Sequence, residues 1–205
     1  MGTMDLKMRV ISNLSTTQQI MLYQKDIKIN VTNYKIGAWE AVKLAPGSIH
    51  TAVLPMDIEV AATDKLGRGN VITKQLPAAT GDVFTVVNNG GAIDIEVADK
   101  KYSSGDGTVD IYNAYPQKVC TCVTKDGKPL FACETRPEYR VNFIIKPKVY
   151  VALSDVEITG EYFDATTLSA NYKVDYTNQA YLTLTLDENV STGAITISHN
   201  FEKFD

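Results

Sequence analysis

The three cysteines of the chain all lie between residues 118 and 135, in the stretch KVCTCVTKDGKPLFACET. Two hydrophobic runs flank Asp126-Gly127 there, a dipeptide typical of the two-residue turn of a β-hairpin. Three thiols on one hairpin could do three kinds of chemistry. They could pack as small reduced side chains, form a disulfide, or hold a soft metal ion such as Cu(I) or zinc.

Strand pairing around this turn separates the three alternatives. A two-residue loop predicts that Lys125 opposes Lys128, and continuing the register places Cys120 opposite Cys133. In the disulfide alternative, Cys120 and Cys133 would be bonded to each other. Cys122 would lie on the same face of the hairpin and would be left out of the bond. A metal site would use Cys120, Cys122 and Cys133 together, but no histidine lies nearby in the sequence to complete it. We favour packed reduced thiols, with the disulfide and then the metal as alternatives.

The elements around this hairpin are predicted to be β-strands, because apolar and polar residues alternate with period two along the chain. Examples are Ile27 to Val31, Ile93 to Val97 and Leu182 to Leu186. Turn signals rich in Gly, Asn and Asp interrupt the runs, and no segment has an apolar stripe at helical spacing. The pattern predicts an all-β fold with little or no helix: an antiparallel β-sandwich, as one large or two small tandem sandwiches.

A repeated pentapeptide, Asp-Ile-Glu-Val-Ala, occurs at residues 57–61 and 94–98. Similar strands precede both copies, and a Gly-x-Gly loop follows each. We therefore predict a duplicated hairpin unit over about residues 37–71 and 70–109. It would belong to a first β-sandwich region, residues 1–115. A second β-rich region, residues 116–205, would follow, either separate or packed on the first as one unit.

Charged residues gather at the glycine-rich loops of the repeat. The first copy carries Lys65 and Arg68, and the second carries Lys100, Lys101 and Asp106. Because binding sites concentrate on loops at strand ends, these residues are candidates for binding a carbohydrate, an anion or a metal. They fit neither a calcium loop nor a helix-linked phosphate loop, and they could equally form an ordinary solvated surface.

Composition and motifs narrow the function classes. A net charge of −4 and a pI near 5.2 give no basic field for nucleic acid, and no apolar run is long enough for a transmembrane helix. The N-terminus MGTMDLKMRV lacks a signal peptide's apolar core, which favours a cytoplasmic location; a secreted one stays open if these residues replace a native start. His50 and His199 lie in strands, where histidine more often makes sheet hydrogen bonds than acts as a base.

These observations predict a non-catalytic binding or self-assembly module that acts through loops or strand edges and forms a homo-oligomer. No cofactor is implied, and no catalytic motif occurs. One alternative is a protein that binds a carbohydrate, an anion or a metal through its glycine-rich loops. Separately, Tyr172, Tyr176 and Tyr181 could line a face that binds a sugar or a partner. The other alternative is an enzyme whose site assembles from distant strands.

Overall fold

The fold is known from a computed structural model that describes residues 5–25, 27–31, 34–64, 73–105, 107–154, 162–163 and 172–205. Strands dominate these residues, and they contain no α-helix, only the short 3₁₀ turn η1 (Lys100–Tyr102). The predicted all-β fold with little or no helix is confirmed. Within the same ranges no helix has the length and apolarity that a membrane crossing requires.

The strands form three sheets. The four-stranded sheet has the order β18 (Ile195–Asn200), β17 (Tyr181–Glu188), β1 (Leu6–Asn13) and β5 (Ile49–Leu54). The five-stranded sheet has the order β3 (Ile27–Ile29), β13 (Arg140–Ile145), β10 (Val109–Asn113), β8 (Val83–Asn89) and β9 (Ala92–Ala98). The long central sheet has the order β16 (Tyr172–Asp175), β14 (Lys148–Ser154), β2 (Gln18–Tyr23), β4 (Tyr34–Leu44), β12 (Lys128–Thr135), β11 (Val119–Lys125), β6 (Ile58–Thr63) and β7 (Leu76–Ala78), with β15 (Tyr162–Phe163) paired to β4.

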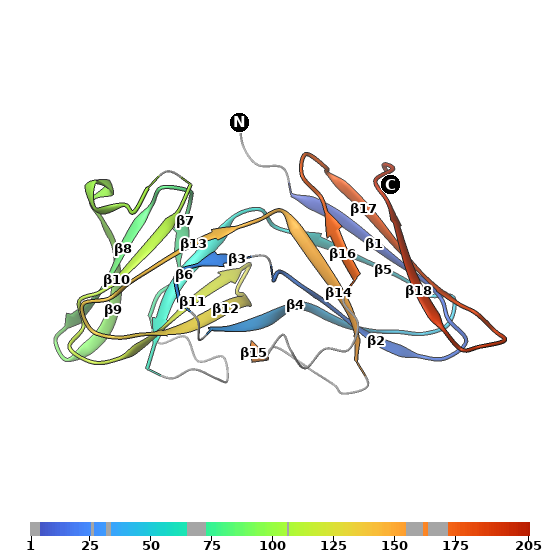
Figure 1. Cartoon of the computed structure of the whole chain (residues 1–205), viewed down its shortest axis with the longest axis horizontal. Helices are drawn as coiled ribbons and strands as arrows, with labels where there is room; N and C mark the ends of the chain where they lie inside the picture. The colour runs from blue at the N-terminus through green and yellow to red at the C-terminus, as the bar shows by residue number, and fades with distance from the viewer. Residues whose placement is uncertain are drawn as a thin grey trace.

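Two lobes lie side by side and share the central sheet (Figure 1). In lobe 1 the four-stranded sheet packs on β2, β4, β14 and β16 around a core that includes Met8, Trp39 and Leu184. In lobe 2 the five-stranded sheet packs on β6, β11 and β12 around a core that includes Phe131 and Phe143. The molecule is therefore two β-sandwiches joined through one continuous sheet, because each sheet must bury one apolar face.

Strands from both sides of residue 116 occur in every sheet. In lobe 1, β1 lies between β5 and β17 and pairs in parallel with β17. In lobe 2, β10 lies between β13 and β8 and pairs in parallel with β8. The boundary expected at residues 115 and 116 does not separate the two cores, and the sheets are mixed rather than purely antiparallel.

The repeated pentapeptide does not mark two equivalent hairpins. In the second copy β8 and β9 pair as predicted, and Gly90 and Gly91 supply the positive φ angles of the tight turn between them. In the first copy β5 pairs with β1, whereas β6 pairs with β11 and β7. The predicted duplicated hairpin unit is wrong, because the glycine-free link Pro55–Asp57 carries the chain from lobe 1 to lobe 2 instead of turning back.

Strand β4 is the element that both lobes share. Tyr34 to Ile36 pair with β12, and Ala38 to Leu44 pair with β2. Gly37 lies between these two halves, and a Cβ atom at this position would be 2.4 Å from the carbonyl oxygen of Pro129. Only a residue without a side chain allows β12 to approach β4 this closely.

Replacing Gly37 with alanine should therefore lower the free energy of unfolding by about 2 kcal/mol or more, since β4 and β12 must separate to admit the methyl group. Urea denaturation would measure the change. Gly90→Ala is the matched control, because Gly90 has a φ of 62° but a Cβ atom added there would have no neighbouring atom within 4 Å. It should cost only about 1 kcal/mol from backbone strain. Equal losses in the two variants would contradict the steric explanation.

Candidate functional site: a cleft between the lobes

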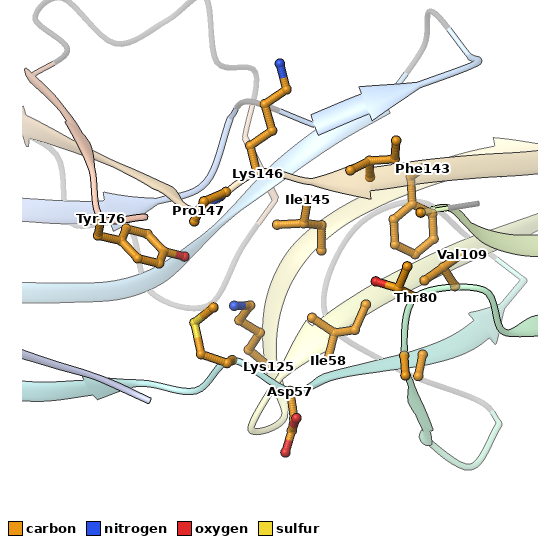
Figure 2. Close-up of a pocket in the computed structure, with 15 residues that line it drawn as sticks. Asp57, Ile58, Thr80, Val109, Lys125, Phe143, Ile145, Lys146, Pro147 and Tyr176 are labelled. Atoms are coloured by element: carbon orange, nitrogen blue, oxygen red, sulfur yellow. The ribbon is translucent and has the colours of Figure 1, made fainter. Parts of the chain in front are cut away.

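A cleft with a volume of about 460 Å³ opens where lobe 2 meets lobe 1 (Figure 2). Its walls come from the link before β6, the end of β7, strands β10 and β13, the tip of β11 and the segment after β16. The lining residues are Met56, Asp57, Ile58, Ala78, Ala79, Thr80, Gly107, Val109, Lys125, Phe143, Ile144, Ile145, Lys146, Pro147 and Tyr176. Most are apolar, so the few polar atoms would decide which ligands fit.

Lys125 is the most unusual of these residues, because its side chain is only 2% exposed. Period-two alternation along β11 directs it inward, on the same face as the core residue Val123. Its Nζ donates a hydrogen bond to the Pro55 carbonyl oxygen over 2.7 Å. Burial lowers the pKa of Lys125 to about 8, against the opposing effect of the Asp5 and Asp57 carboxylates.

Tyr176 brings a hydroxyl group to the cleft from the core of lobe 1. Its oxygen accepts a hydrogen bond from Gln24 Nε2 at 2.8 Å. Burial raises the pKa of Tyr176, so the phenol keeps its proton and can donate it to an acceptor. Figure 2 shows the Tyr176 hydroxyl and the Lys125 amine on the same side of the cleft, while the Lys146 amine extends away. The two lobes thus supply hydrogen-bond donors to one end of the cleft.

The turn after Lys125 is held from both sides. Glu59 accepts hydrogen bonds from Thr124 Oγ1 at 3.1 Å and from the Gly127 amide at 3.3 Å. On the partner strand, Lys128 forms an ion pair with Glu40 and lies 5.0 Å from the centre of the Trp39 ring. The hairpin tip is therefore fixed against β6 in lobe 2 and β4 in the shared sheet, which fixes the backbone of Lys125.

The rim of the cleft includes the second glycine-rich loop. Asp110 is fully buried, and its carboxylate accepts hydrogen bonds from the Ser104 amide at 2.9 Å and from Thr108 Oγ1 at 3.0 Å. The Ser103 and Ser104 hydroxyls also donate to it. This carboxylate holds the loop that places Gly107 against the cleft.

The cysteine hairpin has a different register from the predicted one. Asp126 and Gly127 have φ angles of 50° and 68°, and Lys125 opposes Lys128 as predicted. A β-bulge at Leu130 then shifts the pairing, so that Cys120 opposes Glu134 and Cys133 opposes Thr121. The bulge buries both Leu130 and Phe131 in the core of lobe 2, which explains why it forms.

This register places the thiols on two faces of the sheet. Cys133 joins the lobe 2 core, whereas Cys120 and Cys122 pack with Ala132 on the other face. The predicted opposition of Cys120 and Cys133 is therefore wrong, and none of the three cysteines forms a disulfide. They also cannot converge on one metal ion, and no group of three metal-binding side chains occurs in the described ranges.

The thiols have the surroundings of packed side chains. The Sγ atoms of Cys120 and Cys122 are 4.0 Å apart, and this contact together with burial raises the pKa of Cys120. Burial raises the pKa of Cys133 to about 11. Raised pKa values keep these groups protonated, and a protonated buried thiol is a poor nucleophile and a poor metal ligand.

Of the predicted loop residues, Lys100 and Lys101 do not line the cleft. Lys65, Arg68 and Asp106 lie outside the described residues. Lys100 and Lys101 lie in η1, where they form ion pairs with Asp82 at 3.0 Å and Asp99 at 3.2 Å.

The two histidines are also away from the cleft. His199 Nδ1 is 2.6 Å from the Tyr172 hydroxyl, as expected of a hydrogen-bonded sheet residue. His50 Nε2 is 3.6 Å from a Glu40 carboxylate oxygen. Neither residue lines the cleft.

Sequence reasoning missed Lys125 as a site residue. Its signal was the alternation Val119, Thr121, Val123, Lys125, which places a lysine on the buried face of a strand. The cleft itself had no local signal, because its walls come from strands distant in the sequence.

The fold and the cleft define a two-lobed all-β protein with a buried lysine between its lobes. The model of the RhiA family matches residues 4–196, so this chain belongs to the RhiA family. No curated protein and no solved structure shows a significant match to the chain.

The lowered pKa of Lys125 predicts a pH dependence of stability. Below about pH 8 the folded protein holds Lys125 as a buried ammonium, which costs free energy. From about pH 8 to pH 10.5 the Lys125 amine is largely protonated in the unfolded chain and largely neutral in the folded protein. The contribution of Lys125 to the free energy of unfolding should therefore rise by roughly 3 kcal/mol over this range. The test is the difference between the wild type and Lys125→Met, measured by urea denaturation at both pH values, because it cancels the titration of other groups. A difference that does not change with pH would contradict a buried ammonium.

Proposed function

We propose that this RhiA-family protein is a non-catalytic binding protein whose cleft takes a small molecule with an apolar body and an electron-rich oxygen group, either a carboxylate or a carbonyl. The observation that carries the proposal is the Lys125 ammonium at the wall of an apolar cleft. Within the described residues its one hydrogen-bond acceptor is the Pro55 carbonyl, although an ammonium has three protons to donate. A ligand oxygen would satisfy a donor that is otherwise costly to bury.

The volume and the walls support a small organic ligand. A volume of about 460 Å³ falls within the usual range for small-molecule sites. Side chains such as Ile58, Val109 and Phe143 would contact an alkyl or ring body. A carbohydrate needs many polar partners, so this lining favours an apolar ligand over the sugar suggested by the tyrosines of the sequence.

Eight-carbon compounds with different head groups test this proposal. Octanoate and octan-2-one should bind with saturation in isothermal titration calorimetry, and octylamine should not, because its cation would face Lys125. Lys125→Met should weaken octanoate binding roughly ten- to a hundredfold, the usual effect of losing a charge-assisted hydrogen bond.

Lys101→Met is the matched control for this experiment. It removes an exposed lysine of the glycine-rich loop that does not line the cleft, so octanoate affinity should not change. If neither octanoate nor octan-2-one binds, or if Lys101→Met weakens binding as much as Lys125→Met, the cleft is not the site.

Self-assembly is a second candidate, and strand β5 favours it. This strand is an edge of the four-stranded sheet, and its outer face carries Ile49 and Val53, which are 61% and 50% exposed. Exposed β-branched side chains on an edge strand favour pairing with another strand, and here the partner would be β5 of a second copy.

Native mass spectrometry tests this second candidate. The wild type should be a dimer, and the Ile49→Lys, Val53→Lys double variant should be a monomer with an unchanged circular dichroism spectrum. A monomeric wild type at micromolar concentration would overturn assembly through β5.

A further inference from the structure

We infer that Lys125 captures aldehydes or ketones covalently, by forming an imine with the carbonyl group of a ligand in the cleft between the lobes. This inference rests on the proposed function, because it names the carbonyl compounds as the ligand class and gives the chemistry that would hold them. It makes the site a reversible carbonyl trap rather than a simple hydrogen-bonding site.

The position of Lys125 carries the inference. A lysine amine reacts with a carbonyl group only where the ligand can reach it and where its neutral form is populated. The amine lines the cleft, and its backbone is fixed by the hairpin tip that Glu59 holds. Desolvation of the ammonium increases the fraction of neutral amine near neutral pH, as it does for other lysines that form imines.

Within the described residues no carboxylate forms an ion pair with Lys125, although Asp5 and Asp57 favour its charged form from farther away, and this favours an imine over a stable ion pair. Lys128, on the opposite strand, is neutralised by Glu40 and lies over Trp39. For Lys125, by contrast, the structure gives a carbonyl acceptor, the main-chain oxygen of Pro55, which does not hold a proton on the amine as firmly as a carboxylate would. The two lysines next to one turn thus have opposite environments, and only one of them lines the cleft.

The reaction needs no further reagent. After Lys125 releases a proton to water, its neutral nitrogen attacks the carbonyl carbon and a C–N bond forms. The carbonyl oxygen then leaves as water, taking the two protons that the nitrogen carried, and a C=N bond remains. The Tyr176 hydroxyl, which stays protonated, is a donor for the ligand oxygen before it leaves. Nothing is oxidised or reduced.

Reductive trapping tests this inference on the full chain. The protein is mixed with equimolar octanal and sodium cyanoborohydride at about pH 8, and peptide mapping by mass spectrometry locates the octyl groups. We expect Lys125 to carry at least about ten times more label than Lys128 or Lys101. Excess octanoate should protect Lys125 and leave the label on the exposed Lys101 unchanged.

Two variants make the result specific. Lys125→Met should lose the main adduct. Lys125→Arg keeps a cation but cannot form an imine, so it should retain octanoate binding and lose the adduct. If octanoate binds in the wild type but octanal labels Lys125 no more than Lys128, the imine inference is overturned and the proposed function stands. If neither octanoate nor octanal occupies the cleft, both the imine inference and the proposed function are contradicted.

Discussion

The close approach of β12 to Gly37 is the constraint on which the rest of the structure depends. Strand β4 pairs with β12 before this glycine and with β2 after it, so the central sheet is continuous only if the backbone at Pro129 can lie against residue 37. Without this contact each lobe would have an open sheet edge in the middle of the molecule. The junction between the lobes, and therefore the cleft, exists because one residue of β4 has no side chain.

The same hairpin that meets Gly37 carries the polar group of the cleft. Its tip is held by Glu59 on one side and by Glu40 on the other, and Lys125 extends from it toward Pro55 in the link between the lobes. Burying an ammonium against a neutral carbonyl costs free energy that packing elsewhere must offset. Such a cost is typical of residues that bind a ligand rather than stabilise the fold. Lys125 is therefore a stronger candidate for a ligand-binding residue than the exposed lysines of η1.

The alternation of residues predicted the fold class and the hairpin turn, because both depend on local rules. Period-two runs such as Leu182 to Leu186 are strands, and Asp126-Gly127 has the expected turn angles. The bulge at Leu130 was not predictable from pairing rules, since it forms to bury two adjacent side chains in a distant core. The pentapeptide repeat gave a wrong prediction for a related reason. Strands β6 and β9 have similar sequences, but the links before them lead the two strands to different partner strands. The inward direction of Lys125 could be read from β11, but its cleft could not, because Tyr176 and Phe143 reach it only through the tertiary fold.

The parallel pairing of β1 with β17 has a consequence for how the chain acquires this structure. Lys7 lies beside Tyr181, so an early strand occupies the middle of a sheet that a late strand must complete. During synthesis β1 would leave the ribosome long before β17, so the edge of β1 that pairs with β17 would lack its partner strand until late. Lobe 2, whose strands lie mostly between these ends, can collapse first, and closing lobe 1 then brings together residues far apart in the sequence. Folding of this kind is slow, because closing a long loop costs conformational entropy before the stabilising contacts between its ends have formed.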